Sequence, residues 1–155
     1  MLGGPVNSDV RLLLIKVNHS SYLEKFILWA SQQPAIMAVA LVGSYARGTA
    51  TENSDIDLII LASSSRPYLE NHGWLSLFGD VDHSTNEQWG AVETVRATYQ
   101  TGVEIECNFA QPSWAEVPLD AGTRRVVNDG FEILFDPQHR FDGLQKTLAE
   151  GCAIG

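Results

Sequence analysis

The sequence has few cysteines, few basic residues and no long hydrophobic run, and each shortage excludes a class of protein. Its two cysteines, Cys107 and Cys152, are too few for a disulfide framework or a zinc site. No apolar run reaches the roughly 18 residues that a membrane-spanning helix needs. The apolar stretch 12–17 has no basic segment before it and no clear cleavage site, so we predict no signal peptide. We therefore expect a cytoplasmic protein that does not enter a membrane.

Basic side chains are also scarce, with 10 Lys and Arg against 19 Asp and Glu and a formal net charge of −9. Such a surface repels polyanions, so we do not expect a nucleic acid as a partner. A small anionic ligand remains compatible if metal ions bridge it to the protein. The length of 155 residues and the 45% hydrophobic content suit a globular domain with its own core. No repeat, low-complexity segment or linker divides the chain, so we treat 1–155 as a single domain.

The pattern of apolar residues predicts a mixed β-sheet packed with helices, an α/β or α+β fold. Residues 35–43 and 54–62 are near-continuous apolar runs, typical of strands covered on both faces. Residues 90–100 and 101–110 flank a Thr-Gly turn and predict an antiparallel hairpin. A further strand is expected at 131–136. Helices are expected near 20–33, with Ser21 and Glu24 as a capping box and Pro34 as the end, and at 120–130 and 139–150. Residues 66–78 are expected to form a helix and a loop, and 80–84 a solvated loop.

Acidic residues occupy one face of two of these strands. Side chains alternate faces along a strand, so Asp55 and Asp57 point the same way and their neighbours point to the core. By the same rule, Glu104, Glu106 and Asn108 share one face of their strand. If the two strands are neighbours, the carboxylates converge, and their repulsion raises their pKa values unless cations are present. Mg²⁺, a hard cation that prefers oxygen ligands, would meet this need.

The turn before the first acidic strand is suited to a phosphate. Gly43 follows a buried strand and lets the backbone approach a ligand closely. Ser44 adds a hydroxyl donor at the start of a short predicted helix, whose free amides favour phosphate. Arg47 lies one helical turn later and could neutralise a phosphate. Together with the carboxylates, these residues predict a site for a nucleoside triphosphate and one or two metal ions.

These motifs carry a resemblance to a known superfamily. Gly43-Ser44 followed after ten residues by Asp55-Ile56-Asp57, in "GSYARGTATENSDIDL", resembles the nucleotidyltransferase superfamily that includes DNA polymerase β and the aminoglycoside nucleotidyltransferases. The form is close to that of small bacterial and minimal nucleotidyltransferases. "VEIECNF", residues 103–109, resembles a strand of the kanamycin nucleotidyltransferase type, which makes Glu106, not Glu104, the third carboxylate. The match covers 36–61 and 103–109 and implies the nucleotidyltransferase fold.

The resemblance implies transfer of a nucleoside monophosphate from a nucleoside triphosphate, with ATP as the expected donor, to a hydroxyl on a small molecule or protein. Mg²⁺ is the implied cofactor, bound by Asp55, Asp57 and Glu106, and Glu106 would also help to activate the acceptor. Ser44 and Arg47 would contact the β- and γ-phosphates. Aminoglycoside enzymes carry a second, helical domain, whereas only about 45 residues follow residue 110 here. A second copy of the chain or a small helical partner protein would then complete the acceptor site.

Other interpretations stay open at this point. The chain could be an antitoxin-like module that binds a partner protein with little turnover, or a nucleotide-binding scaffold without chemistry. The intact set of Ser44 and three carboxylates argues against the scaffold. Single residues also have simpler interpretations. Arg47 could pair with Glu52, and Arg124 and Arg125 could lie on a solvated helix face. We expect no metal binding by the histidines at 19, 72, 83 and 139, and an inert buried thiol at Cys107. Core packing is a more common role than a base or acceptor pocket for Trp74, Trp89 and Trp114.

Overall fold

The fold is described by a computed structural model that covers residues 8–50, 55–116 and 121–154. Within these ranges the side chains of residues 8–19, 47, 122 and 149–154 are not described. No helix in the described ranges is both long enough and apolar enough to span a membrane.

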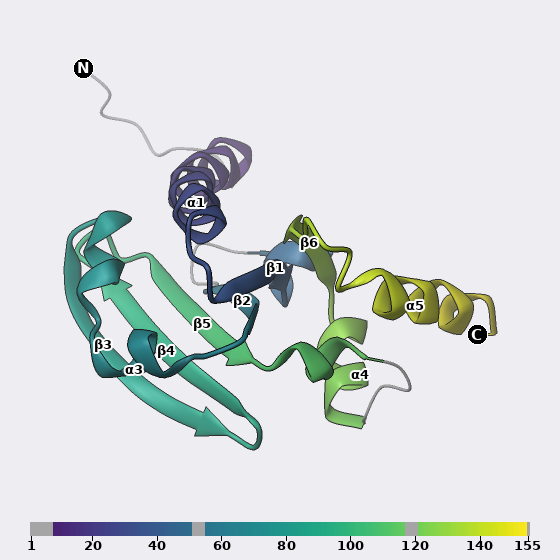
Figure 1. The fold of residues 1–155 in the computed structure, drawn as a ribbon. Coiled ribbons are helices and arrows are strands. Elements are labelled where there is room, and N and C mark those ends of the chain that lie inside the picture. The colour runs from purple at the N-terminus through teal and green to yellow at the C-terminus, as the bar shows by residue number, and fades with distance from the viewer. Residues whose placement is uncertain (1–7, 51–54, 117–120, 155) are drawn as a thin grey trace.

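Six strands form one mixed sheet in the order β3-β4-β5-β2-β1-β6 (Figure 1). The strand β2 runs parallel to β5, and every other neighbouring pair is antiparallel. The expected mixed sheet with helices is therefore confirmed. The strands are β1 (Ile36–Val42), β2 (Ile56–Ala62), β3 (Val81–Trp89), β4 (Val92–Tyr99), β5 (Glu104–Ala110) and β6 (Phe131–Phe135).

Helices cover both faces of the sheet. On one face, Phe26 of α1, Tyr68 of α3 and Leu75 of η1 belong to a single buried cluster with alternate residues of the strands. On the other face, Val127 of α4 and Leu144 of α5 pack on β1 and β2. The helices are α1 (Ser8–Ser31), α2 (Ser44–Arg47), α3 (Arg66–Glu70), the 3-10 helices η1 (Gly73–Leu77) and η2 (Pro112–Ala115), α4 (Ala121–Asn128) and α5 (Asp142–Ile154).

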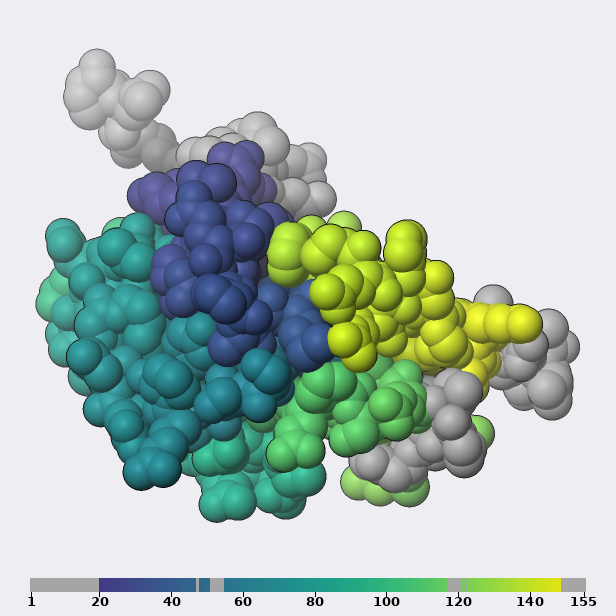
Figure 2. Space-filling model, in the orientation of Figure 1, coloured from purple at the N-terminus to yellow at the C-terminus, as the bar shows by residue number. Residues whose placement is uncertain are grey.

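The two helical layers are not equally wide. Figure 1 shows α4 and α5 on the side of the molecule that carries β6, with the β3–β4 hairpin extending on the opposite side. Figure 2 shows the described part of α1 between the segment of β3 and β4 and the segment of β6 and α5. The buried cluster beneath α4 and α5 includes no residue of β3 and only the partly buried Val92 of β4. This cluster therefore does not extend over the hairpin, and the acidic residues of β2 and β5 lie on the same face of the sheet.

Two local predictions were wrong. The helix α1 begins at Ser8 instead of near Ser21. Ser21 is therefore an exposed residue inside the helix and not its cap. A Ser-x-x-Glu pattern caps a helix only where the backbone amides are free, and here the preceding helical turns already bind those amides. Residues 80–84 were expected to form a loop, but Val81 begins the edge strand β3. This strand is held by backbone pairing with β4, and its mostly exposed, polar side chains lack the apolar alternation of a half-buried strand.

Candidate functional site

The parallel pairing of β2 with β5 brings the two halves of the acidic motif together. In this register Asp57 lies opposite Glu106, and Ile56 lies opposite Ile105. Ile56 and Ile105 are buried in the core, so both acids point to the open face of the sheet. The predicted shared face of the carboxylates is therefore present. Neighbouring parallel strands keep their facing side chains close, so the charge of each acid acts directly on the other.

Asp57 is the most strongly perturbed carboxylate of this face. Burial raises its pKa to about 8, and a hydrogen bond with Glu106 and the charges of Glu106 and Asp55 act in the same direction. Its Oδ1 atom is buried and accepts no hydrogen bond from any described residue. A buried carboxylate oxygen without a donor is costly, so this position calls for a cation or a shared proton.

Asp55 forms a second carboxyl pair, with Glu104. A hydrogen bond between them raises the pKa of Glu104, and burial and the charge of Asp55 add to the effect. Asp55 also lies near Tyr45 of α2, where burial and then the Asp55 charge raise the pKa of the phenol to about 12. Glu104, which the resemblance does not count among the metal ligands, therefore takes part in the acidic cluster.

Arg96 of β4 lies between the two carboxyl pairs, and sequence reasoning missed it. Its Nη2 atom is 3.3 Å from Glu106 Oε1, and its Nη1 atom is 3.4 Å from Asp55 Oδ2. The charge of Arg96 lowers the pKa of Asp57 and of Glu104, against the other effects there. No motif marks this arginine. Only the strand register, which places Arg96 opposite Glu106, would have revealed it.

Gly43 allows the chain to pass directly over Asp57. It has φ +77°, a conformation that side chains with a Cβ rarely adopt. A Cβ atom at this position would lie 2.9 Å from Asp57 Oδ2. Ser44 follows as the first residue of the four-residue helix α2, as expected from the sequence. The side chain of Arg47, predicted to contact a phosphate, and Glu52, its alternative partner, lie outside the described part of the structure.

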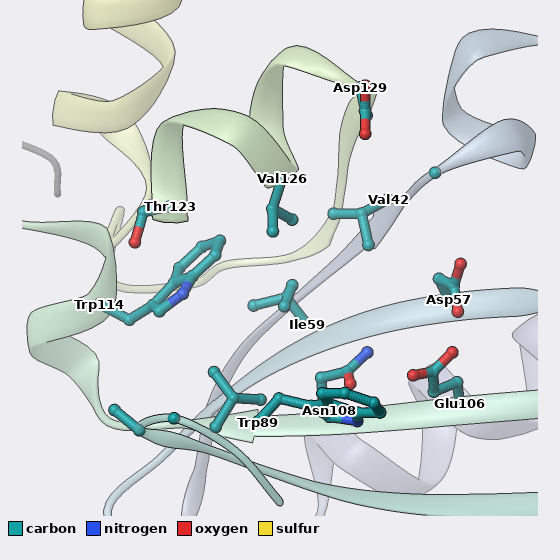
Figure 3. A pocket seen from close by; sticks show the side chains of 14 residues that line it. Val42, Asp57, Ile59, Trp89, Glu106, Asn108, Trp114, Thr123, Val126 and Asp129 are labelled. Carbon is teal, nitrogen blue, oxygen red and sulfur yellow. The ribbon is translucent and has the colours of Figure 1, made fainter. Parts of the chain in front are cut away.

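A cavity of about 540 Å³ runs from the Asp57–Glu106 pair across the open face of the sheet (Figure 3). Its floor includes Asn108, which is fixed by a hydrogen bond from its Nδ2 to the carbonyl oxygen of Leu58, 2.9 Å long. Figure 3 shows Asp57 and Glu106 close together at one end, with Trp114 near the other. Such a volume is in the range of small-molecule sites. The cavity therefore joins an acidic end to a largely apolar one.

The tryptophans divide between this cavity and the core. Trp89, which is 61% exposed, and Trp114 line the cavity. Trp74 instead stacks on Trp29, with ring centroids 4.9 Å apart, against the core beneath α1. The simpler interpretation, core packing, is therefore right for Trp74, and Trp114 both packs against the buried cluster beneath α4 and α5 and lines the cavity. Other expectations are confirmed: Arg124 and Arg125 are exposed and Cys107 is buried, which raises the pKa of its thiol.

The predicted metal ligands share one face but do not form one ligand group. In the described part of the chain, no group of three or more His, Cys, Asp or Glu side chains is arranged to hold a metal ion. Asp55 contacts Arg96 and is hydrogen-bonded to Glu104, although its charge also acts on Asp57. That pair offers adjacent oxygen atoms, one of them buried and without a donor, which is the chemistry that a hard divalent cation requires. The residues therefore fit a cation at Asp57 and Glu106.

A comparison with known protein families identifies the family of this chain. The sequence profile of the nucleotidyltransferase domain family matches residues 21–102, more than half of the chain. The chain belongs to this family. The matched range contains Gly43, Ser44, Asp55 and Asp57, and Glu106 follows just beyond it. A comparison with curated proteins gives no match.

A solved structure is also similar to this one. It is an aminoglycoside 6-adenyltransferase from Bacillus subtilis, with a TM-score of 0.47 and 16% sequence identity. The alignment covers 62% of this chain and 35% of that chain, so the protein described here matches about a third of the other's length.

Proposed function

We propose that this nucleotidyltransferase-family protein transfers a nucleoside monophosphate from a nucleoside triphosphate to a hydroxyl group, in the cavity beside Asp57. The observation that carries the proposal is the Asp57–Glu106 pair. It combines a raised pKa, a buried oxygen without a donor and a glycine whose backbone passes close to Asp57. A carboxyl pair with no purpose beyond stability would be costly to keep. Perturbed carboxyls beside a cavity favour a reactive site.

Asp57 and Glu106 would hold a Mg²⁺ ion, and Asp55 would join them once it is released from Arg96. When bound, the ion neutralises charge on the phosphates and on the attacking oxygen. Asp57 is suited to be the central ligand, because a nearby cation lowers its pKa and removes the cost of its buried Oδ1. The backbone at Gly43 and the hydroxyl of Ser44 would face the β- and γ-phosphates, with Arg47 as a further contact.

The reaction then requires only positioning and one proton acceptor. The acceptor hydroxyl oxygen bonds to the α-phosphorus, and the bond from this phosphorus to the oxygen bridging to the β-phosphate breaks. Pyrophosphate leaves with the electron pair of the broken bond. Glu106 would take the hydroxyl proton, because it lines the cavity beside Asp57 and is not fully buried. No covalent intermediate with the protein is needed.

The apolar end of the cavity would take the nucleoside. With the phosphates at Asp57 and Glu106, the rest of a nucleotide extends over Ile59 toward Trp89 and Trp114, which line the same cavity. Aromatic side chains stack on the faces of bases without strong sequence preference. We retain ATP as the expected donor, and a small molecule or protein hydroxyl as the acceptor. A supply of nucleoside triphosphates and the free thiol of Cys107 both favour the cytoplasm as the location.

The test is pyrophosphate release from ATP labelled at the α-phosphate. The protein is incubated with Mg²⁺ and with hydroxyl acceptors that include sugars, amino sugars and the chain itself. We expect pyrophosphate to appear together with labelled acceptor, and Asp57→Asn and Glu106→Gln to abolish both. The exposed Asp80 provides the control, and Asp80→Asn should keep full activity. Release of the γ-phosphate alone, or full transfer by Asp57→Asn, would overturn the proposal.

A further inference from the structure

Arg96 is surrounded by carboxylates from two strands, β3 and β5, and from Asp55, the residue before β2. Besides its contacts with Asp55 and Glu106, its Nη1 atom lies 3.7 Å from Glu104 Oε1. Its Nε and Nη2 atoms donate to both oxygens of Glu87, at 3.3 Å and 3.4 Å. The side chain is 27% exposed, so much of it is removed from water. The positive charge of Arg96 therefore offsets part of the repulsion among the acids of this cluster.

The contacts of Arg96 are of two kinds. The contacts with Asp55 and Glu106 each use one nitrogen and lie toward the proposed metal site. The contact with Glu87 uses two parallel nitrogen–oxygen pairs, the planar geometry in which arginine binds a carboxylate most specifically. Glu87 is itself oriented by a hydrogen bond from Trp89 Nε1, 3.2 Å long. Glu87 is thus a fixed anchor on β3, outside the metal site.

In the present arrangement, a divalent cation and Arg96 cannot both bind the carboxylate oxygens of Asp55 and Glu106. Two of the three predicted ligands, Asp55 and Glu106, already face the guanidinium. A cation bridging them would stand within a few ångströms of another positive charge, and such repulsion is strong in a partly buried site. The guanidinium can move away from Asp55 and Glu106 and stay bound to Glu87, because its bidentate contact with Glu87 does not involve the predicted ligands.

We propose that Arg96 is the resident cation of the carboxylate cluster, that it competes with divalent metal for Asp55 and Glu106, and that Glu87 retains it when the metal binds. The inference rests on the proposed metal site at Asp57 and Glu106. In the metal-free protein, the charge of Arg96 stabilises the fold because it reduces the repulsion among the clustered carboxylates. The metal must displace it, so the affinity for metal alone is held down.

The test is a calorimetric titration of the metal-free protein with Mn²⁺ alone, together with a thermal melt in EDTA. Removal of the charge in Arg96→Gln should strengthen Mn²⁺ binding about tenfold or more. The same variant should lower the melting temperature in EDTA by several degrees, because the acids lose their counter-ion. A purely structural arginine would give only the second effect. Arg96→Lys keeps the charge without the fork and should bind Mn²⁺ within about threefold of the wild type.

Glu87 provides an independent test in the opposite direction. Glu87→Gln weakens the anchor, so Arg96 stays with Asp55 and Glu106, and Mn²⁺ binding should weaken about threefold or more. Glu70→Gln makes the same change in net charge at an exposed pair with Arg66 and should leave Mn²⁺ binding within about twofold. Arg66→Gln is the matched control for Arg96→Gln, because it makes the same change in net charge at the exposed pair, and it should also leave Mn²⁺ binding within about twofold.

Several outcomes would overturn the inference. If Arg96→Gln binds Mn²⁺ no more tightly than the wild type, while the wild type does bind it, the competition does not exist and the metal site still stands. If Arg66→Gln strengthens binding as much as Arg96→Gln, the effect is one of net charge alone. If neither the wild type nor Arg96→Gln binds Mn²⁺, the proposed metal site fails and the inference fails with it.

Discussion

Gly43 and Asp57 approach each other so closely that no side chain fits between them. A Cβ atom on Gly43 would lie 2.9 Å from Asp57 Oδ2, and the backbone there has φ +77° and ψ −152°. This conformation is almost restricted to glycine. The motif Gly-Ser followed by Asp-x-Asp thus has a steric cause, because the turn after β1 has to pass over the central carboxylate of β2.

Gly43→Ala should therefore cost both stability and ligand binding. We expect a loss of about 1–3 kcal/mol in the free energy of unfolding, from the strained backbone alone. We also expect Mg²⁺-dependent binding of ATP to weaken at least about tenfold, because the new methyl group pushes on Asp57. Urea denaturation and calorimetry measure the two effects. Gly48→Ala is the matched control: φ is +75° but no atom lies within 4 Å, so it should lose stability and keep binding.

The pKa of Asp57 predicts that the site destabilises the metal-free protein above neutral pH. The folded value is about 8, and an unfolded aspartate has a pKa of about 4. Between these values the folded state binds more protons than the unfolded state, so stability falls as the pH rises from about 4 to 8. The cost is fully present above pH 8. It is absent below pH 4, where the carboxyl is neutral in both states.

Asp57→Asn should remove that cost. In EDTA at pH 8.5 we expect the variant to be more stable than the wild type by about 1–3 kcal/mol, a range that allows for the partial exposure of the side chain. At pH 4 the difference should nearly vanish. Urea denaturation at both pH values gives the answer, with Asp80→Asn as the surface control. A variant that is less stable than the wild type at pH 8.5 would contradict the assigned environment of Asp57.

Trp89 should contribute to binding of the nucleoside part of a nucleotide and not to binding of its phosphates. Trp89→Ala should weaken ATP binding about tenfold, the loss expected for one stacking contact, and leave inorganic triphosphate unchanged. Trp89→Phe should stay within about threefold of the wild type for both ligands. Leu77 is similarly exposed, at 59%, but lies outside the cavity, so Leu77→Ala should change neither. Equal loss of both ligands in Trp89→Ala would place the nucleoside elsewhere.

Thr94 fixes the floor of the cavity through Asn108. Its hydroxyl donates to Asn108 Oδ1 over 2.7 Å, and Thr94 is fully buried. Thr94→Val keeps the shape but leaves the amide oxygen without this donor, so we expect a loss of about 1–2 kcal/mol in unfolding free energy. Thr98→Val, on the same strand and half-buried, is the comparison and should cost less. An unchanged midpoint in urea for Thr94→Val would show that the bond carries no net stability.

The sequence was sufficient for the parts of the site that depend on alternation along a strand. The facing of Asp57 and Glu106 follows from period two once β2 and β5 are neighbours, and the apolar runs around them identify both strands. The turn at Gly43 was recognised because a glycine after a buried strand signals close approach. These features are local, so a single sequence contains them.

The remainder depends on pairing between distant segments. Arg96 is one residue in an ordinary strand, and only the antiparallel register with β5 makes it a neighbour of Glu106. The edge strand β3 was missed because backbone bonds to β4 stabilise it without an apolar face. The division of the acids into two pairs arises from three strands together. No local pattern in residues 80–84, "DVDHS", or around Arg96 predicts these contacts.

The central claim is that Asp57 and Glu106 hold a divalent cation together with a nucleoside triphosphate. The most direct measurement is calorimetric titration of ATP, with GTP, CTP and UTP alongside, in Mg²⁺ and in EDTA, for the wild type and Asp57→Asn. The account predicts binding by the wild type in Mg²⁺, and little or none in EDTA or in the variant. Binding that is the same with and without Mg²⁺, or that survives Asp57→Asn, would contradict it.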